Sequence, residues 1–414
     1  MYYFFYIPIG TEARVRGTPW GTIAITAINV LVFLFFSLFP GFEIDYYRLA
    51  LLPGAPSLLT SITSSFLHAG WFHLASNLLY LVLLGPPIES RIGTGRFLVA
   101  YLGFAGLANM AQAAWVLTAA PDLTSVPIVG SSGAIAGVMG LFLVRLYFVR
   151  LRIASILLFY LHGVARPTRF ALPAVVAIGS WFVLQAVYQL VDSSGGTAYV
   201  SHLSGLLFGI GLGFLLGFGG EGRLERRLVL GDRYAQRGEW FAALGEYESY
   251  LARVPDDPEV LIQAARVHRV TDQSMRSVDR FRQAIAAWLK RGDLGAACDA
   301  FDEMKRLLGN VTIPASDLLR VARGFEQRGR PSDASRAYEA YGRNYPAAPG
   351  ATTALLKAAD IERKLLNNPG RAQFLLRELL HRPLTPEMER LARERLRATE
   401  EALAAQRAPG RAIA

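Results

Sequence analysis

The sequence predicts an all-α protein in two parts, a six-helix transmembrane bundle followed by a soluble α-solenoid. Two observations support this fold class. Residues 1–220 are dominated by Leu, Phe, Ala, Val, Ile and Gly, whereas residues 221–414 are rich in Arg, Glu, Asp and Ala. In addition, the first part contains apolar stretches of about 20 residues, the length that crosses a bilayer as a helix.

Six stretches have the length and apolarity of membrane-spanning helices. They are residues 20–39, 71–88, 97–117, 128–149, 170–191 and 200–218. A shorter apolar stretch, 153–161, is bracketed by arginines, and we expect it to form an interfacial hairpin. We expect the aromatic residues at positions 2–6 to lie at the bilayer interface. The start of the sequence does not have the pattern of a removable signal peptide.

Arginine residues alternate between the connections that join these stretches. They occur before the first span and after the second, fourth and sixth, whereas residues 118–127 and 192–199 contain no Lys or Arg. The positive-inside rule therefore predicts that both termini are cytoplasmic. The sequence shows no organelle transit signal, so we expect a multi-pass protein of a bacterial inner membrane.

A glycine-rich segment separates the two parts and indicates a hinge. Its glycines are Gly217, Gly219, Gly220 and Gly222. We therefore expect three regions: a cytoplasmic segment at 1–19, a membrane domain at 20–220 and a cytoplasmic helical-repeat domain at 221–414.

Small and aromatic residues in the second part recur with the spacing of tetratricopeptide-like helical hairpins. The first set is Tyr234, Gly238, Ala242, Tyr247, Leu251 and Pro255, and later sets begin at Gly292, Gly329 and Ala372. The spacing is irregular, so an irregular helical bundle remains the alternative. Repeats of this kind would bind a protein partner, a peptide segment or another copy of the chain.

The charge and cysteine content exclude several functional classes. The net charge is +10, but no basic run with interleaved aromatic residues is present, so we do not predict nucleic-acid binding. The single cysteine, Cys298, rules out an internal disulfide framework and is interpreted as a core residue. The histidines show no metal-ligand spacing, so we expect neither a metal nor another cofactor.

Three motifs place polar residues inside the apolar spans. His73 and Asn77 lie four residues apart and therefore share one helix face. Polar groups at membrane depth are costly and commonly line a cavity or a functional path. Hydrogen bonding between helices is the alternative explanation for this pair.

The second motif begins the fourth span and runs from Gly130 to Gly137. Gly133 and Gly137 form a small-residue face that allows close helix approach, and helix packing alone would explain both. Ser131 is expected to be the helix N-cap. Ser132 then lies in the first turn, where backbone N–H groups are free.

The third motif begins the sixth span with His202, followed by Gly205 and Gly209. Its glycine face matches that of the fourth span. If the two faces pack together, Ser132 and His202 lie at a similar depth. A lone histidine in a membrane helix would otherwise serve packing or proton transfer.

Together these residues could perform hydrolysis. Such chemistry needs a nucleophile, a base within about 3 Å and donors directed at the oxyanion. Ser132 is the expected nucleophile and His202 the base, while the Ser132 N–H, His73 and Asn77 are expected donors. The spans contain no acidic residue to orient His202, so the sequence predicts a dyad.

In these three motifs and their order, residues 20–218 resemble the rhomboid intramembrane proteases. The resemblance implies a serine endopeptidase that cleaves single-span membrane proteins through Ser132 and His202, with His73, Asn77 and the Ser132 N–H as oxyanion hole. It also implies a water-filled cavity on the extracytoplasmic side. Trp181 and Phe182 fall where the family's fifth helix forms a lateral gate.

The sequence departs from the family pattern in two places. Leu59 and Thr60 replace a Trp-Arg pair in the first loop, and Ala136 replaces an aromatic residue beneath the histidine. The alternative functions are a catalytically silent rhomboid-like factor that binds or chaperones membrane proteins, and a transporter. The intact Ser132 and His202 disfavour the first, and the lack of acidic residues deep in the spans disfavours the second.

Overall fold

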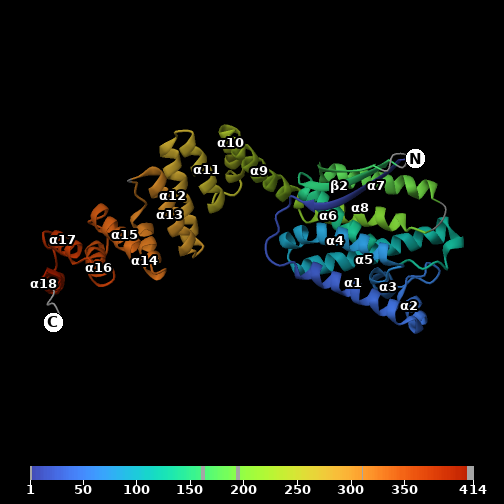
Figure 1. Ribbon diagram of the computed structural model, residues 1–414, viewed down its shortest axis with the longest axis horizontal. Coiled ribbons are helices and arrows are strands. Elements are labelled where there is room, and N and C mark those ends of the chain that lie inside the picture. Colours follow the sequence, from blue (N-terminus) through green and yellow to red (C-terminus); the bar gives the residue numbers. More distant parts are fainter. Residues whose placement is uncertain (1, 160–163, 193–195, 310, 408–414) are drawn as a thin grey trace. The chain divides into compact units, whose positions relative to one another are not determined.

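The computed structural model describes residues 2–159, 164–192, 196–309 and 311–407. Helices dominate these residues, so the predicted all-α class is confirmed, with one small sheet in addition. The chain divides into two compact units, Met1–Arg226 and Arg227–Ala414, close to the boundary expected at residue 220. Figure 1 labels the helices of both units and strand β2 of the first unit.

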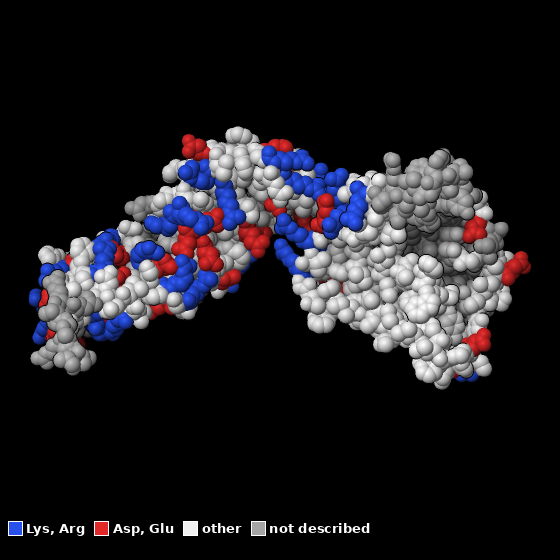
Figure 2. All heavy atoms as spheres, viewed as in Figure 1, with Lys and Arg blue, Asp and Glu red and all other residues white. Residues whose placement is uncertain are grey.

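The first unit contains the apolar helices. They are α1 (Trp20–Leu38), α2 (Glu43–Leu49), α3 (Leu58–Thr63), α4 (Trp71–Ile92), α5 (Thr94–Ala119), α6 (Ser132–Leu146), α7 (Ala174–Val191) and α8 (Tyr199–Leu215). Helices α1, α4, α5 and α7 are each long and apolar enough to cross a membrane, and α8 meets α9 (Phe218–Gln236) at a bend of 82°. The described part of this unit shows few charged side chains on the face drawn in Figure 2.

Two of the predicted spans are shorter as helices than expected. The stretch 128–149 contains α6, whose 15 residues extend only about 22 Å. Ile128 instead forms an isolated bridge with Leu51. The stretch 170–191 contains α7, which begins at Ala174 because residues 170–173 complete a strand. Apolar composition alone does not separate a buried strand from a helix.

The additional sheet is antiparallel, in the order β1 (Tyr2–Thr11), β2 (Arg150–Phe159) and β3 (Val164–Pro173). The hairpin predicted at 153–161 is therefore a β-hairpin, and its turn lies outside the described residues. Residues 2–6 belong to β1, a strand that the sequence did not predict. Pro8 is accommodated because β1 is an edge strand whose register shifts between Pro8 and Gly10.

Glu89, near the end of α4, fixes the start of α1. Its carboxylate is buried and accepts hydrogen bonds from the Gly21 N–H at 2.6 Å and from the Thr22 N–H and hydroxyl, both at 2.8 Å. The Thr94 hydroxyl donates a fourth bond at 2.7 Å. Because the first turn of a helix leaves N–H groups unpaired, this carboxylate satisfies donors that would otherwise be buried without partners.

The second unit is a succession of helices. They are α10 (Trp240–Leu251), α11 (Pro258–Val270), α12 (Ser274–Lys290), α13 (Leu294–Leu308), α14 (Ala315–Gln327), α15 (Pro331–Asn344), α16 (Ala351–Lys364), α17 (Pro369–Leu380) and α18 (Pro386–Arg407). Each helix packs against the next one along the chain. Packing mainly between helices that are neighbours in sequence is the organisation of a helical-repeat array.

Left-handed residues form several of the short turns in this array. Gly238, Gly292 and Gly329 have φ between +66° and +78°, in agreement with the predicted glycine positions. Asp272 and Asn367 take the same conformation in two further turns, with φ of 58° and 48°. Asp and Asn tolerate this conformation better than other residues with a side chain. The spacing between the glycines is irregular because Asp272 and Asn367 take the place of glycine in two of the turns.

Candidate active site

Ser132 is the first residue of α6, and the segment before it positions its backbone. Gly130 has φ of +118°, and a Cβ at this position would lie 2.6 Å from the His73 ring. Only glycine fits both constraints. Ser131 occupies the predicted N-cap position, but its hydroxyl does not cap the helix and instead lies 3.4 Å from His68 Nε2. The first-turn N–H groups of α6 therefore have no side-chain cap.

His202 lies in the first turn of α8 and contacts Ser132 directly. The distance between His202 Nε2 and Ser132 Oγ is 2.8 Å, although 70 residues separate them in sequence. Both side chains are only partly buried. The imidazole nitrogen can therefore accept the serine proton without any further movement.

Glycines bring α6 and α8 together at this depth. A Cβ placed on Gly205 would overlap the Gly133 carbonyl oxygen, and one on Gly209 would overlap the Gly137 carbonyl oxygen. The two predicted glycine faces therefore meet. Since no side chain separates the backbones, the two first turns lie close enough for Ser132 and His202 to touch.

His73 and Asn77 of α4 converge on the segment before Ser132. The His73 ring packs against Gly130, and Asn77 Nδ2 lies 3.7 Å from the position of a Gly130 Cβ. Asn77 is buried, and its Nδ2 has no hydrogen-bond partner among the described residues. A buried donor without a partner costs stability, so its retention points to a ligand or reaction intermediate that it meets during function.

Residues 55–218 match the Rhomboid domain family. These residues form a rhomboid domain. Similar proteins include Rhomboid protein 1, mitochondrial, of Saccharomyces cerevisiae (26% identity over 51% of this chain and 57% of that protein). Two Bacillus subtilis proteins are also similar, the putative rhomboid protease YdcA (33% identity over 30% of this chain and 61% of that protein) and the rhomboid protease GluP (28% identity over 53% of this chain and 39% of that protein). The chain thus spans less than two thirds of the length of these relatives.

The comparison with solved structures gives a likeness that spans most of the chain. The TPR domain of P58(IPK) aligns over 82% of this chain and 98% of its own, with 10% identity and a TM-score of 0.21. That score is too low to carry an argument. The helical character of the second unit follows from its own helices.

Gln185 is one of the polar residues around His202 that the sequence did not predict. Gln185 of α7 is buried, and its Oε1 lies 2.7 Å from His202 Nδ1. The available signal was a polar amide within an apolar span, four residues after Trp181. The sequence analysis expected an acidic partner for His202 or none, whereas the partner is the side-chain amide of Gln185.

Two aromatic rings flank His202, although Ala136 stands where the family has an aromatic residue. The Trp181 ring centroid lies 5.8 Å from that of the imidazole, and Tyr199 meets the imidazole edge-on at 6.4 Å. Ala136 is fully buried and lies 3.2 Å from the position of a Gly205 Cβ. A larger residue at this position would force α6 and α8 apart, so the aromatic contact comes from α7 and α8 instead.

Polar residues of α5 hold the first turn of α8. Gln112 Oε1 accepts a hydrogen bond from the Ser201 N–H at 3.0 Å, and Asn109 Oδ1 accepts one from the Ser201 hydroxyl at 3.1 Å. Asn109 also donates to the Ser61 carbonyl at 3.0 Å. All these groups are buried. They fix the helix turn that carries His202, and the sequence analysis did not identify them.

The first loop has its own local structure at the departure from the family pattern. Thr60 and Ser57 form a capping box at the start of α3, with the Thr60 N–H donating to Ser57 Oγ at 3.1 Å. Leu59 is exposed beside it. A capped helix therefore occupies the position where the family has its Trp-Arg pair.

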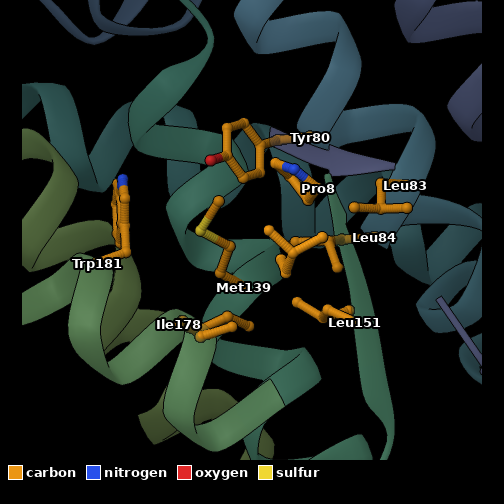
Figure 3. A pocket seen from close by; sticks show the side chains of 10 residues that line it. Pro8, Tyr80, Leu83, Leu84, Met139, Leu151, Ile178 and Trp181 are labelled. Atoms are coloured by element: carbon orange, nitrogen blue, oxygen red, sulfur yellow. The ribbon is translucent and has the colours of Figure 1, made fainter. Parts of the chain in front are cut away.

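The expected gate residues lie on the least enclosed of the long apolar helices. In an apolar stretch of 18 residues, only 22% of α7 is buried inside the protein, compared with 50% of α5. Trp181 and Phe182 are both partly buried. Figure 3 shows that Trp181 also lines a small cavity with Tyr80, Met139 and Ile178. This cavity of about 20 Å³ is apolar and contains neither Ser132 nor His202, so it is a packing gap next to the site.

A larger cavity of about 550 Å³ lies at the amino end of α4. Its lining includes Phe33, Tyr46, His68 and Trp71. His73, Ser132 and His202 do not line it. Among the described residues, no group of three or more His, Cys, Asp or Glu side chains has the arrangement of a metal site.

Proposed function

We propose that this protein is an intramembrane serine endopeptidase that cleaves transmembrane proteins through a Ser132–His202 dyad. The distance of 2.8 Å between Ser132 Oγ and His202 Nε2 carries the proposal. A serine hydroxyl is a weak nucleophile unless a base accepts its proton, and a contact of this length allows that transfer. The membership of residues 55–218 in the rhomboid domain family supports the same chemistry.

The reaction follows the usual course of acyl transfer. Ser132 Oγ attacks the peptide carbonyl while His202 Nε2 takes the hydroxyl proton. The negative charge that develops on the carbonyl oxygen is stabilised by the Ser132 N–H, the Asn77 amide and His73. His202 then protonates the leaving amine, and in the second half of the reaction it activates the water that releases the acyl group.

The substrates we propose are single-span membrane proteins, cut near or within the transmembrane helix and often after a small residue. Ser132 begins a helix that is too short to cross the bilayer, which agrees with a reaction below the membrane surface. Substrates would enter past α7, whose Trp181 and Phe182 we propose as the gate. No metal or other cofactor is needed for this chemistry.

We further propose a bacterial inner membrane location with both termini in the cytoplasm. The arginine distribution supports this orientation. A protease added to one side of sealed membranes would test it. Digestion of α10–α18 from the extracytoplasmic side would contradict the proposal.

The helical-repeat unit is proposed to bind a protein or peptide partner. The chain without α10–α18 should cleave a purified reporter normally but process native membrane substrates less well, because recruitment is lost. Equal processing by both forms in native membranes would contradict a recruiting role.

The dyad is tested with the full chain reconstituted in liposomes that contain a fluorescent single-span reporter. Ser132→Ala and His202→Ala should each abolish cleavage and fluorophosphonate labelling. Ser204→Ala is the matched control, because this hydroxyl on α8 bonds only to carbonyls of its own helix. Cleavage that persists in Ser132→Ala would refute the proposal. A wild-type protein that neither cleaves nor reacts would instead be the silent binding factor.

A further inference from the structure

We propose that Gln185 is the positioning residue of His202, so that the site is a Ser–His–Gln arrangement rather than an isolated dyad. The carboxamide oxygen of Gln185 accepts the Nδ1–H of the imidazole and leaves the Nε2 lone pair directed at Ser132. This inference rests on the proposed peptidase function, which it extends by one residue.

The geometry aligns three polar groups from three helices. Gln185 Oε1 lies 2.7 Å from His202 Nδ1, and His202 Nε2 lies 2.8 Å from Ser132 Oγ. Both nitrogens of the ring are therefore engaged, one on α7 and the other on α6. Rotation of the imidazole would break both contacts.

The burial of Gln185 is unusual for its helix. Its neighbours Val183, Leu184 and Val187 are exposed on the surface of the unit, whereas Gln185 is 9% exposed. A buried amide must find hydrogen-bond partners. Here the partner is His202, so the least enclosed long helix directs a polar side chain at the base.

The identity of the acceptor determines which ring nitrogen carries the proton. A neutral imidazole has one N–H and one lone pair. If the Gln185 oxygen faces Nδ1, that nitrogen carries the hydrogen and Nε2 can accept the Ser132 proton. The reversed amide would place the hydrogen on Nε2, which could then only donate to Ser132 and could not act as base.

An amide also suits the surroundings better than a carboxylate. The imidazole must be neutral to accept the serine proton, so a buried carboxylate beside it would carry an uncompensated charge until the imidazolium formed. Gln185 orients the ring without that charge. Trp181 and Tyr199 restrict the ring from its sides, and His73 of α4 is the other titratable group that interacts with it.

The first test removes the acceptor while conserving side-chain length. Gln185→Met in the full reconstituted chain should lower kcat on the single-span reporter by about 10- to 100-fold, the size of effect known for groups that orient metal-bound histidines. KM should stay within about twofold, because Gln185 is buried and its carboxamide oxygen is engaged by His202. Fluorophosphonate labelling of Ser132 should slow by a similar factor. Gln189→Met on the same helix is the matched control and should behave as wild type.

The second test restores an acceptor of a different charge. Gln185→Glu should recover much of the activity, because a carboxylate oxygen can accept the Nδ1–H. It would also favour the protonated ring, so the acid limb of the pH–rate profile should move to higher pH. The displacement would show that the side chain at position 185 faces the imidazole, and recovery of kcat by Gln185→Glu but not by Gln185→Met would distinguish positioning from packing.

The outcomes separate this inference from the proposed function. If wild type shows no cleavage and no labelling, the peptidase proposal itself fails. If wild type is active and Gln185→Met matches Gln189→Met, the peptidase proposal stands and the positioning role is overturned. Gln185→Glu as inactive as Gln185→Met would overturn the assignment of the oxygen as acceptor.

Discussion

Gly209 of α8 packs directly on the carbonyl group of Gly137 in α6. A Cβ on Gly209 would overlap the carbonyl oxygen and lie 2.8 Å from the carbonyl carbon. The two helices are therefore in backbone contact at this level, one turn beyond the equivalent contact between Gly205 and Gly133. This approach fixes the separation of the two helix starts and hence the distance between Ser132 and His202.

The first prediction concerns this contact. Gly209→Ala should lower the stability of the first unit by about 1–3 kcal/mol, because even one methyl group overpacks the interface. It should also slow fluorophosphonate labelling of Ser132. Gly211→Ala is the matched control, since no atom lies within 4 Å of a Cβ at that position. Thermal unfolding in detergent and the labelling rate measure both effects. Equal stability of the two variants would disprove the backbone contact.

Asn77 provides the second prediction. Asn77→Ala should reduce kcat by about 100- to 1000-fold, the typical loss for one oxyanion donor. Folding should be little affected, because Asn77 Nδ2 has no partner among the described residues that the substitution would leave unpaired. Ser76→Ala is the control, as its hydroxyl bonds only to the His73 carbonyl of its own helix. A kcat within threefold of wild type would exclude Asn77 from the oxyanion site.

The gate proposal gives the third prediction. Phe182→Ala should increase kcat/KM for the single-span reporter, because a smaller side chain on α7 eases entry. Fluorophosphonate labelling should not change, since Phe182 has no ring contact with His202, unlike Trp181. Parallel measurement of the two rates distinguishes entry from chemistry. A proportional change in both would show that Phe182 acts on the reaction itself.

The two residues that the sequence predicts as a pair, Ser132 and His202, lie 2.8 Å apart in the structure. Ser132 and His202 are polar residues in apolar helices, each followed by a glycine pair, so both the chemistry and the helix contact have local signals. Gln185 lacks such a signal. Its importance depends on which face of α7 turns toward α8, and that is a tertiary property.

For similar reasons, the sequence predicted most of the membrane helices but neither strand β1 nor the start of α6. Apolar length identifies membrane helices well because the bilayer imposes it. Strand β1 pairs with β2 more than 140 residues later, for example Ile7 with Ala154, and no local pattern reveals such a partner. Likewise, α6 begins at Ser132 because Ile128 pairs with Leu51, a contact between distant segments. In one turn of the second unit, Asp272 has the left-handed conformation that glycine has in other turns. A sequence pattern based on glycine therefore does not reveal the repeat at this turn.

The fourth prediction concerns Glu225, in the second turn of α9. Arg145 lies 2.7 Å from its carboxylate, and Arg91 donates to it as well. Burial opposes ionisation, but the hydrogen bonds and charges of Arg91 and Arg145 outweigh it and hold the pKa of Glu225 below its usual range. Glu225→Gln should therefore cost about 1–2 kcal/mol at neutral pH.

The pH dependence of this effect has a definite sign. The stabilisation by Glu225 is complete above the unfolded-state pKa of about 4.5 and is lost as the pH falls through the lower pKa of the folded state. The difference in unfolding free energy between wild type and Glu225→Gln should therefore vanish in acid. Glu221→Gln is the control, because Glu221 is more exposed and contacts Arg145 at 3.2 Å. A difference that persists unchanged well below pH 4 would contradict the ion-pair explanation.

The fifth prediction uses Cys298 of α13 as a reporter of the helical-repeat unit. The thiol is fully buried, packs within 2.8 Å of the position of a Gly324 Cβ and donates to the Val321 carbonyl. Burial raises its pKa from 9.0 to about 11, which lowers the thiolate fraction at neutral pH by about 100-fold.

A maleimide should therefore label the native protein very slowly and the denatured protein rapidly. Labelling across a urea series should follow the loss of helical circular dichroism from this unit. Rapid modification of Cys298 without denaturant would show that α13 and α14 open locally, and the packing described for them would then be wrong.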